Sequence, residues 1–248
     1  MAEVDPTAKL GGGVQLGKNT LVEAGVVVGN NTVIGHNVVL HKGTTIGAGV
    51  RIDDNVVIGK QPMRAAFSTL KVEDALAPAE IGDECIIGTS VVIYAGCRLG
   101  KKILVADLAT IRENVKVGDA TIVGRGVAIE NLCEVGSRVK LETGCYITAR
   151  SIIEDLCFVA PMVTTSNDNF LGRTEERFKY TKGPHLKRGA RVGANAVLLP
   201  GIVIGEDAVV GAGAVAVRDV PPYKVYVGVP AHELRDTPEE QRLPKEDR

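Results

Sequence analysis

Large aromatic side chains are nearly missing from this sequence. It has no tryptophan and only 4% aromatic residues, although 45% of it is hydrophobic. A core must therefore be built from small and β-branched side chains, which is unusual for a globule and favours a repetitive architecture. An uncharged apolar run long enough for a membrane helix is also missing, as are the basic start and apolar segment of a signal peptide. We expect a soluble cytoplasmic protein.

Net charge and histidine are scarce as well. The formal charge is -1 over 248 residues, which excludes a global electrostatic attraction to nucleic acid or to a membrane surface. The four histidines are scattered along the chain, so three of them cannot be assembled as metal ligands within one subunit. We predict no metal site.

What the sequence does have is a period of six. Every sixth residue is aliphatic or small over residues 10–58, 81–159 and 192–216, and the next residue is often glycine, which suits a tight turn. A period of six is neither the 3.6 of a helix nor the 2.0 of a plain strand, so each hexad predicts a short strand followed by a turn. The pattern indicates a parallel β-helix.

This signature resembles the left-handed β-helix acyltransferases over about residues 10–230. The resemblance implies an all-β fold in which three hexads make one triangular coil. The left-handed sense of the coil also comes from the resemblance, because the general rule for crossovers between parallel strands predicts a right-handed one. We predict a β-helix domain over residues 1–230 with inserted loops at 61–80 and 165–191. A tail at 231–248 follows and is the one segment open to a helix.

The five cysteines occupy one place in the hexad, four residues after the aliphatic one, where threonine, valine or alanine stands elsewhere. They should point inward as small core residues. With 18 residues to a coil, no two of them fall in the same slot of adjacent coils, so neither a disulfide nor a zinc cluster is predicted. They are Cys85, Cys97, Cys133, Cys145 and Cys157.

The loops are the first places to look for function, because insertions into a solenoid are tolerated and commonly carry binding residues. The segment between Leu171 and Arg191 contains seven basic residues and only two acidic ones. A solvated surface explains such a run as well as a clamp for diphosphate or CoA phosphates does. In the clamp, Arg173 and Arg177 would bind substrate through bidentate hydrogen bonds.

The last repeat block resembles the C-terminal coils of hexapeptide acetyltransferases, in which acyl-CoA lies in a groove between subunits of a trimer. The matching residues are the GAGA turn at 211–214, Arg218 and the later GVPA segment. The resemblance implies a homotrimer with acyl-CoA as co-substrate, and acetyl-CoA is the expected form. Ala194, Ala212 and Ala214 would let the pantetheine arm approach, and Arg218 would meet a phosphate, although glycine and alanine also simply cap coils.

The stretch KLETGCYITARSIIEDLCFVAPMVTTSND, residues 140–168, resembles N-acetyltransferases that act on nucleotide-linked amino sugars. A neutral amine is already a competent nucleophile, so a dedicated histidine is dispensable. The resemblance implies two catalytic residues: Glu142, which accepts the proton or orients the amine, and Asp168. Asn167 and Asn169 would help to bind the sugar, although such a cluster is also common turn chemistry.

One column of residues, spaced by 18, carries large polar side chains where other columns carry glycine or alanine. It contains Tyr94, Arg112, Glu130 and Thr148. Adjacent coils lie about 4.8 Å apart, so Arg112 and Glu130 are predicted to form an ion pair, for which a structural role is the favoured interpretation.

Other functions remain open. O-acyl transfer, including the lipid A type that acts on a UDP-sugar, needs a histidine base, and Glu113 stands where the resembling segment TIRENVKVGD would place it. His36 and His41 are expected to decorate the prism, and His185 is a weaker alternative base. A metal-dependent β-helix carbonic anhydrase needs three histidine ligands. A non-catalytic scaffold would bind no acyl-CoA.

Overall fold

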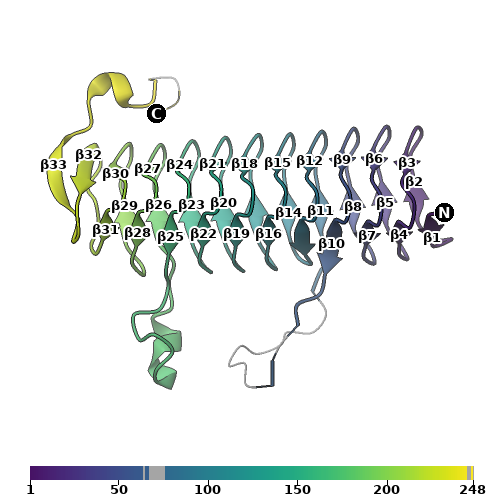
Figure 1. Cartoon of the computed structure of the whole chain (residues 1–248), viewed down its shortest axis with the longest axis horizontal. Helices are drawn as coiled ribbons and strands as arrows, with labels where there is room; N and C mark the ends of the chain where they lie inside the picture. Colours follow the sequence, from purple (N-terminus) through teal and green to yellow (C-terminus); the bar gives the residue numbers. More distant parts are fainter. Residues whose placement is uncertain (64, 67–75, 245–246, 248) are drawn as a thin grey trace.

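The computed structural model describes residues 1–63, 65–66, 76–244 and 247. They form a triangular prism of stacked coils, with the amino terminus at one end and the last coil at the other (Figure 1). Each coil passes through three short strands that pair in parallel with residues 18 positions away, as Val33 does with Arg51. This is the parallel β-helix that the hexapeptide pattern predicts, of the left-handed kind that the resemblance implies.

Three sheets form the faces of the prism and are named A, B and C here. Sheet A contains β1 (Glu3–Val4), β4 (Leu21–Val22), β7 (Val39–Leu40), β10 (Val57–Lys60), β13 (Val92–Tyr94), β16 (Thr110–Ile111), β19 (Ala128–Ile129), β22 (Tyr146–Ile147), β25 (Thr164–Thr165), β28 (Val197–Leu198) and β31 (Val215–Ala216). Sheet B contains β2 (Lys9–Leu10), β5 (Val27–Val28), β8 (Thr45–Ile46), β11 (Glu80–Ile81), β14 (Arg98–Leu99), β17 (Lys116–Val117), β20 (Glu134–Val135), β23 (Ile152–Ile153), β26 (His185–Leu186) and β29 (Val203–Ile204). Sheet C contains β3 (Gln15–Leu16), β6 (Val33–Ile34), β9 (Arg51–Ile52), β12 (Ile86–Ile87), β15 (Leu104–Val105), β18 (Ile122–Val123), β21 (Lys140–Leu141), β24 (Phe158–Val159), β27 (Arg191–Val192), β30 (Val209–Val210), β32 (Lys224–Val227) and β33 (His232–Asp236).

A single hexad shows why the sequence folds in this way. Ile34 and Val38 point into the prism and are 2% and 0% exposed, whereas Val33 faces solvent and is 44% exposed. Asn37 makes the turn at φ 55°, in the left-handed region that asparagine tolerates better than most residues. Each hexad therefore supplies two core residues and one corner.

The second inward slot of the hexad is shared by cysteines and threonines. All five cysteines are buried and free, which confirms their predicted place in the core. The thiol of Cys97 donates to the carbonyl of Arg112 at 2.9 Å, and the hydroxyl of Thr121 donates to the carbonyl of Gly136 at 2.8 Å. In both cases the acceptor lies 15 residues later, so the two residue types make the same contact with the next coil.

The repeat extends further than its sequence pattern indicates. β1 adds a hexad at the amino end, and the second loop covers residues 166–184 rather than 165–191. Leu186 and Ala190 fill inward slots at 1% and 0% exposure, although Lys187 stands where glycine usually follows the aliphatic residue. The basic run of the sequence is therefore divided between the loop and the prism.

The two loops and the tail leave the prism on different sides. The described parts of the first loop (61–63, 65–66 and 76–79) and the second loop (166–184, with the 3-10 helix η1 at Glu175–Lys179) project from one side, and the described part of the tail lies on the opposite side (Figure 1). The tail begins with β33, which pairs antiparallel with β32, and continues through the 3-10 helix η2 (Glu239–Gln241). No helix within the described ranges is long and apolar enough to cross a membrane.

Candidate functional site

The three edges of the prism carry different side chains directly after the inward-facing residue. On the edge between sheets B and C (the BC edge) the series is Gly11, Gly29, Gly47, Gly82, Gly100, Gly118, Gly136, Glu154, Lys187 and Gly205. On the CA edge it is Gly17, Gly35, Asp53, Gly88, Ala106, Gly124, Glu142, Ala160, Gly193 and Gly211. On the AB edge it is Asp5, Glu23, His41, Gly59, Tyr94, Arg112, Glu130, Thr148, Ser166, Leu199 and Val217. Polar and aromatic groups are concentrated on the AB edge.

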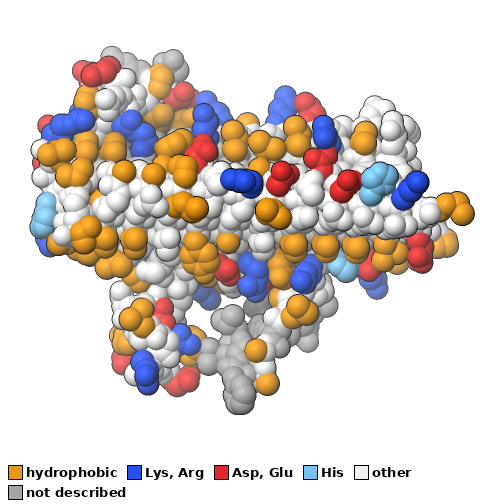
Figure 2. All heavy atoms as spheres, viewed as in Figure 1, with side chains coloured by type: hydrophobic (Ala, Val, Ile, Leu, Met, Phe, Trp, Pro, Cys, Tyr) orange, Lys and Arg blue, Asp and Glu red, His pale blue; other side chains and the backbone are white. Residues whose placement is uncertain are grey.

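Both loops also leave from the AB edge. The first follows β10 and the second follows β25, and both strands belong to sheet A. Between the loops, basic and acidic side chains gather on the underside of the prism (Figure 2). The loops therefore flank the edge that is richest in polar and aromatic side chains, and we take this stretch as the candidate site.

Five side chains form a connected group on this stretch, which we name the edge cluster: Lys60, Tyr94, Arg112, Glu113 and Glu130. The Lys60 ammonium lies 5.4 Å and the Arg112 guanidinium 5.0 Å from the centre of the Tyr94 ring, within the range of cation–π attraction. Arg112 donates from Nε to Glu113 Oε2 at 2.8 Å and from Nη2 to Glu113 Oε1 at 3.1 Å. Its contact with Glu130 Oε2 is longer, at 3.4 Å.

The predicted ion pair between Arg112 and Glu130 is therefore present but secondary. Glu113, whose side chain is 12% exposed, takes the two-point contact with the guanidinium. Burial raises the pKa of Glu130, and the nearby Glu113 charge adds to the rise while Arg112 opposes it. Burial beside Glu130 also raises the pKa of Tyr146. A half-buried carboxylate with one long contact retains the capacity to bind an ammonium or hydroxyl group.

The second loop is organised by Asp168. One carboxylate oxygen accepts the N–H of Phe170 at 2.8 Å, and the other accepts the N–H of Gly172 and a guanidinium N–H of Arg177, both at 2.9 Å. These contacts, led by the Gly172 N–H, lower the pKa of Asp168. Because both oxygens are engaged, Asp168 fixes the loop and is a poor acceptor for a further proton.

The other residues predicted for substrate binding vary in their surroundings. Asn167 donates to the carbonyl of Ala149 at 3.3 Å and so ties the loop to the preceding coil. Arg177 lies with its guanidinium 4.6 Å from the centre of the Phe178 ring. Asn169 and Arg173 are exposed. The AB edge brings Asn167 close to the end of the polar column, whereas the arginines belong to the loop itself.

Glu142 lies on a different edge from Asp168. It follows β21 of sheet C, on the CA edge, where it is half-buried, whereas Asp168 follows a strand of sheet A. The predicted acyl-CoA residues Ala194 and Ala212 share the CA edge with Glu142. The predicted site residues therefore divide between two borders of sheet A, and a single chain does not bring them together.

Two more predicted acyl-CoA residues have other surroundings. Ala214 occupies an inward slot and is fully buried, so its side chain belongs to the core rather than to a groove wall. Arg218 is exposed and follows β31 of sheet A, at the far end of the AB edge.

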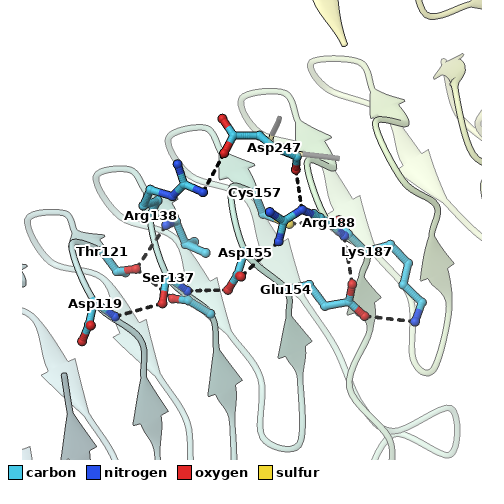
Figure 3. Close-up of polar contacts among 12 residues, drawn as sticks. Asp119, Thr121, Ser137, Arg138, Glu154, Asp155, Cys157, Lys187, Arg188 and Asp247 are labelled. Carbon is cyan, nitrogen blue, oxygen red and sulfur yellow. Dashed lines mark hydrogen bonds and ion pairs between the residues drawn. The ribbon is translucent and has the colours of Figure 1, made fainter. Parts of the chain in front are cut away.

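A second polar network lies on the BC edge and anchors the tail (Figure 3). Arg188 donates to Asp155 at 3.1 Å and to the carbonyl of Asp247 at 2.6 Å, and the Asp247 carboxylate accepts from Arg138 at 2.8 Å. The Lys187 ammonium donates to Glu154 at 3.0 Å. Every charge in this network has a partner, so it fastens the tail to the prism.

The sequence pattern does not reveal Glu113 and Lys60 as members of a functional cluster. Glu113 stands one position after the polar column, and Lys60 belongs to a strand whose pairing with β13 shifts register between Ile58 and Lys60. The 18-residue spacing does not reveal either residue as a partner of Arg112 or Tyr94. No group of three possible metal ligands occurs in the described part of the chain.

Comparisons with known proteins agree with the fold. The model of the bacterial transferase hexapeptide (six repeats) matches residues 25–60 and 183–216, and that of the hexapeptide repeat of succinyl-transferase matches residues 8–30 and 78–106. Two solved UDP-N-acetylglucosamine acyltransferases superpose on 95% of this chain and 73% of their own. One is from Bacteroides fragilis, with a TM-score of 0.51 at 21% identity, and the other from Arabidopsis, with 0.52 at 18%. These likenesses show the fold.

Curated relatives match over shorter stretches. A dTDP-3-amino-3,6-dideoxy-alpha-D-galactopyranose 3-N-acetyltransferase from Aneurinibacillus thermoaerophilus is 52% identical over 46 residues, which cover 18% of this chain and 24% of the relative. A 2,3,4,5-tetrahydropyridine-2,6-dicarboxylate N-acetyltransferase from Brevibacillus brevis is 45% identical over 51 residues, 21% of this chain and 22% of that protein. The chain thus spans about a quarter of the length of these relatives.

Proposed function

The chain belongs to the hexapeptide-repeat family of left-handed β-helix proteins, and on that premise we propose that it is an acyl-CoA-dependent N-acyltransferase. The acceptor in this proposal is the amine of a nucleotide-linked amino sugar. The observation that carries it is the AB edge, where two loops flank a cluster of carboxylates and cations on a prism whose other two edges are mostly glycine and alanine. The similarity to a sugar N-acetyltransferase supports the same acceptor.

The proposal places the acyl donor on the CA edge. Ala194 and Ala212 leave room there for a pantetheine arm, and their backbone groups can hydrogen-bond it. Glu142 stands on the same edge, where its carboxylate would orient the amine of the acceptor. Backbone N–H groups would stabilise the oxyanion that forms as the amine attacks the thioester carbonyl.

Donor and acceptor residues on opposite borders of sheet A meet only if a second copy contributes one of them. We therefore include a homotrimer with its sites between subunits. The outer face of sheet A supports this, since its outward residues are uncharged from Leu21 to Val215. Sheet B differs, because its outer face carries ion pairs such as Lys116 with Glu134 at 2.8 Å. Five free cysteines suit a reducing compartment, so the proposal places the protein in the cytoplasm.

The test is thiol release from acetyl-CoA by the purified protein with a panel of nucleotide amino sugars. The matched control is the corresponding nucleotide sugar with a hydroxyl in place of the amine. Release only with an amino sugar supports the proposal. Release only with the hydroxyl sugar, or only from long hydroxyacyl donors, favours the UDP-sugar acyltransferase alternative, and no acyl-CoA binding at all favours a scaffold.

The same assay separates the donor and acceptor sides. Arg218→Ala is expected to raise the KM for acyl-CoA alone, and Asp168→Ala to raise the KM for the sugar by loosening the second loop. Light scattering should report about three times 26.1 kDa. A monomer that turns over at the rate of the bulk sample contradicts the shared site.

A further inference from the structure

The side chain of Arg191 has two buried nitrogen atoms, Nε and Nη2, that find no hydrogen-bond acceptor in the described part of the chain. A buried guanidinium normally has a carboxylate or carbonyl partner, because an uncompensated buried charge destabilises the folded protein. The packing of the single chain therefore gives no reason for an arginine at this position.

The two nitrogens act together as a binding group. Nε and Nη2 lie on the same edge of the guanidinium plane, so their N–H bonds point in nearly the same direction. Such a pair of donors matches two oxygens of a carboxylate or of a phosphate, which arginine binds through two hydrogen bonds at once. The atoms that lack acceptors are thus the ones suited to an oxyanion.

An arginine at the equivalent place of an earlier coil shows which partner is missing. Arg51 and Arg191 are each the first residue of a sheet C strand, β9 and β27, and the CA edge begins two residues later in both coils. Nε of Arg51 donates to the carboxylate of Asp53 at 2.8 Å. The corresponding residue after Arg191 is Gly193, which has no side chain. An oxyanion beside Gly193 would take the role that Asp53 has for Arg51.

Arg191 lies on the strand that leads into the proposed donor site. Ala194 follows it by three residues on the CA edge, and Ala212 stands on the same edge one coil later. Arg218, to which the sequence assigns a phosphate contact, lies at the far end of the AB edge. Within one chain, Arg191 and not Arg218 adjoins the residues assigned to the pantetheine arm.

The outer face of sheet C around Arg191 suits a nucleotide. The residues next to Arg191 in register are Phe158 and Val209, and Lys140 is next to Phe158. Lys140 adds a second positive charge, and Phe158, which is 37% exposed, offers a ring of the kind on which bases stack. Because Nε and Nη2 are buried, an oxyanion reaches them only when a neighbouring side chain moves, and Phe158 has solvent to move into.

We propose that Arg191 is an oxyanion-binding residue, which takes a phosphate group of a nucleotide substrate bound along the CA edge. The inference rests on the proposed function, in which the acyl donor and the acceptor both carry phosphate groups. The position beside Ala194 favours the donor. The charge of Arg191 is uncompensated only in the free protein, and the bound phosphate supplies the missing acceptors.

The experiment measures the binding of CoA, UDP and dTDP by calorimetry to the wild type, to Arg191→Met and to the control Arg51→Met. We expect Arg191→Met to raise the Kd by about 10- to 100-fold, as the loss of hydrogen bonds to a charged group does. An effect on CoA identifies the donor as the source of the phosphate, and an effect on UDP or dTDP identifies the acceptor. Arg51→Met should leave every Kd unchanged, because Asp53 already occupies its guanidinium.

A conservative variant tests the two-point contact. Arg191→Lys keeps the positive charge but has no parallel pair of donors, so it should recover little of the lost affinity. If the donor is the source, the KM for acetyl-CoA should rise in both variants, whereas the KM for acetyl-pantetheine, which lacks the phosphates, should stay at the wild-type value.

Thermal melting separates binding from a structural role. Without ligand, Arg191→Met should melt at a higher temperature than the wild type, because it removes an uncompensated buried charge. A lower melting temperature would reveal an internal acceptor and overturn the proposal, as would unchanged Kd values for all three nucleotides, in both cases with acyl transfer still standing. A wild-type protein that binds none of these nucleotides overturns the proposed function, and this inference falls with it.

Discussion

The BC edge and the AB edge are equivalent corners of the prism. The BC edge carries mostly glycine after the inward-facing residue, whereas the AB edge carries mostly polar and aromatic side chains. At the BC edge a Cβ on Gly118 would lie 2.6 Å from the carbonyl carbon of Gly136, so the next coil approaches too closely for a side chain at this position. Asp155 accepts the N–H of Ser137 at 2.7 Å, and the Ser137 hydroxyl accepts the N–H of Asp119 at 3.1 Å, which forms a ladder along the edge (Figure 3).

The AB edge replaces this ladder with side chains that bond to one another. Arg112 takes the corner position, bonds Glu113 and Glu130, and stacks on Tyr94. The comparison teaches that the glycine-rich edges serve packing, and that the AB edge, where Gly59 is an exception among larger side chains, is where the fold has room for binding groups. Four substitutions test this difference.

The largest effect is expected from a side chain placed on the packing edge. Gly118→Val forces the branched side chain into the backbone of the next coil and should cost about 3 kcal/mol of unfolding free energy, measured by urea denaturation. Glu130→Ala, at a corner of the AB edge, is the matched control and should stay near wild type. Equal stability of the two variants would contradict the assignment of the BC edge to packing.

A smaller loss is expected when the edge cluster is opened. Arg112→Ala leaves the carboxylate of Glu113 half-enclosed without its two-point partner, which should cost about 1–2 kcal/mol and raise the KM for the acceptor. Arg51→Ala is the control, because Arg51 makes a comparable 2.8 Å contact with Asp53 but on an exposed surface. Should both variants lose the same stability and keep wild-type KM, the edge cluster is no more than another surface ion pair.

The core slot common to all the coils gives an intermediate effect. Cys97→Ala removes a thiol hydrogen bond and leaves a small cavity, for a cost of about 1 kcal/mol, whereas Cys97→Thr keeps a donor in a slot that already accepts threonine. Burial raises the pKa of Cys97 to about 12, so a thiol reagent should modify it only after unfolding. Fast modification of the native protein, or loss of turnover in a folded alanine variant, would show that the thiol is accessible or reactive.

The smallest effect is the one that separates a structural from a binding role for Glu130. Its folded-state pKa is raised, so folding favours the protonated carboxyl, and the stabilisation present at low pH is lost as the pH rises through the folded pKa. Glu130→Gln removes this dependence and should leave neutral-pH stability unchanged or slightly higher, while the KM for the acceptor rises. A clear loss of stability at neutral pH would instead support the structural role that the sequence favours for the ion pair between Arg112 and Glu130.

The solenoid and its corners are readable in the sequence because they repeat. A residue every six positions marks the inward slot, and a coil of 18 residues places Glu23 beside His41 and Arg112 beside Glu130 before any coordinates are known. The contact between Glu23 and His41 follows from this spacing, although the sequence alone favours a place on the outside of the prism for histidines of the early coils. The rule also failed at Leu186, because the residue that follows it is lysine and not glycine.

The contacts that do not repeat were out of reach. Glu113 meets Arg112 because of the direction of its side chain within one turn, and Lys60 meets Tyr94 because β10 shifts its register just before the first loop. Asp168 bonds Arg177 inside a loop of irregular backbone. These three contacts depend on local geometry that the period of six does not encode, and they account for most of the candidate site.

The two loops leave the same edge from β10 and β25, which are separated by five steps in the order of sheet A. At about 4.8 Å for each step, the distance between their bases is roughly 24 Å and can change only in whole coils. The prism thus sets the distance between the two loops in steps of one coil. Removing or adding one 18-residue unit between the loops would move one loop toward or away from the other while every edge, face and core slot kept its register. A protein built in this way can change the distance between its two loops through a single in-frame duplication or deletion, without a change in either loop.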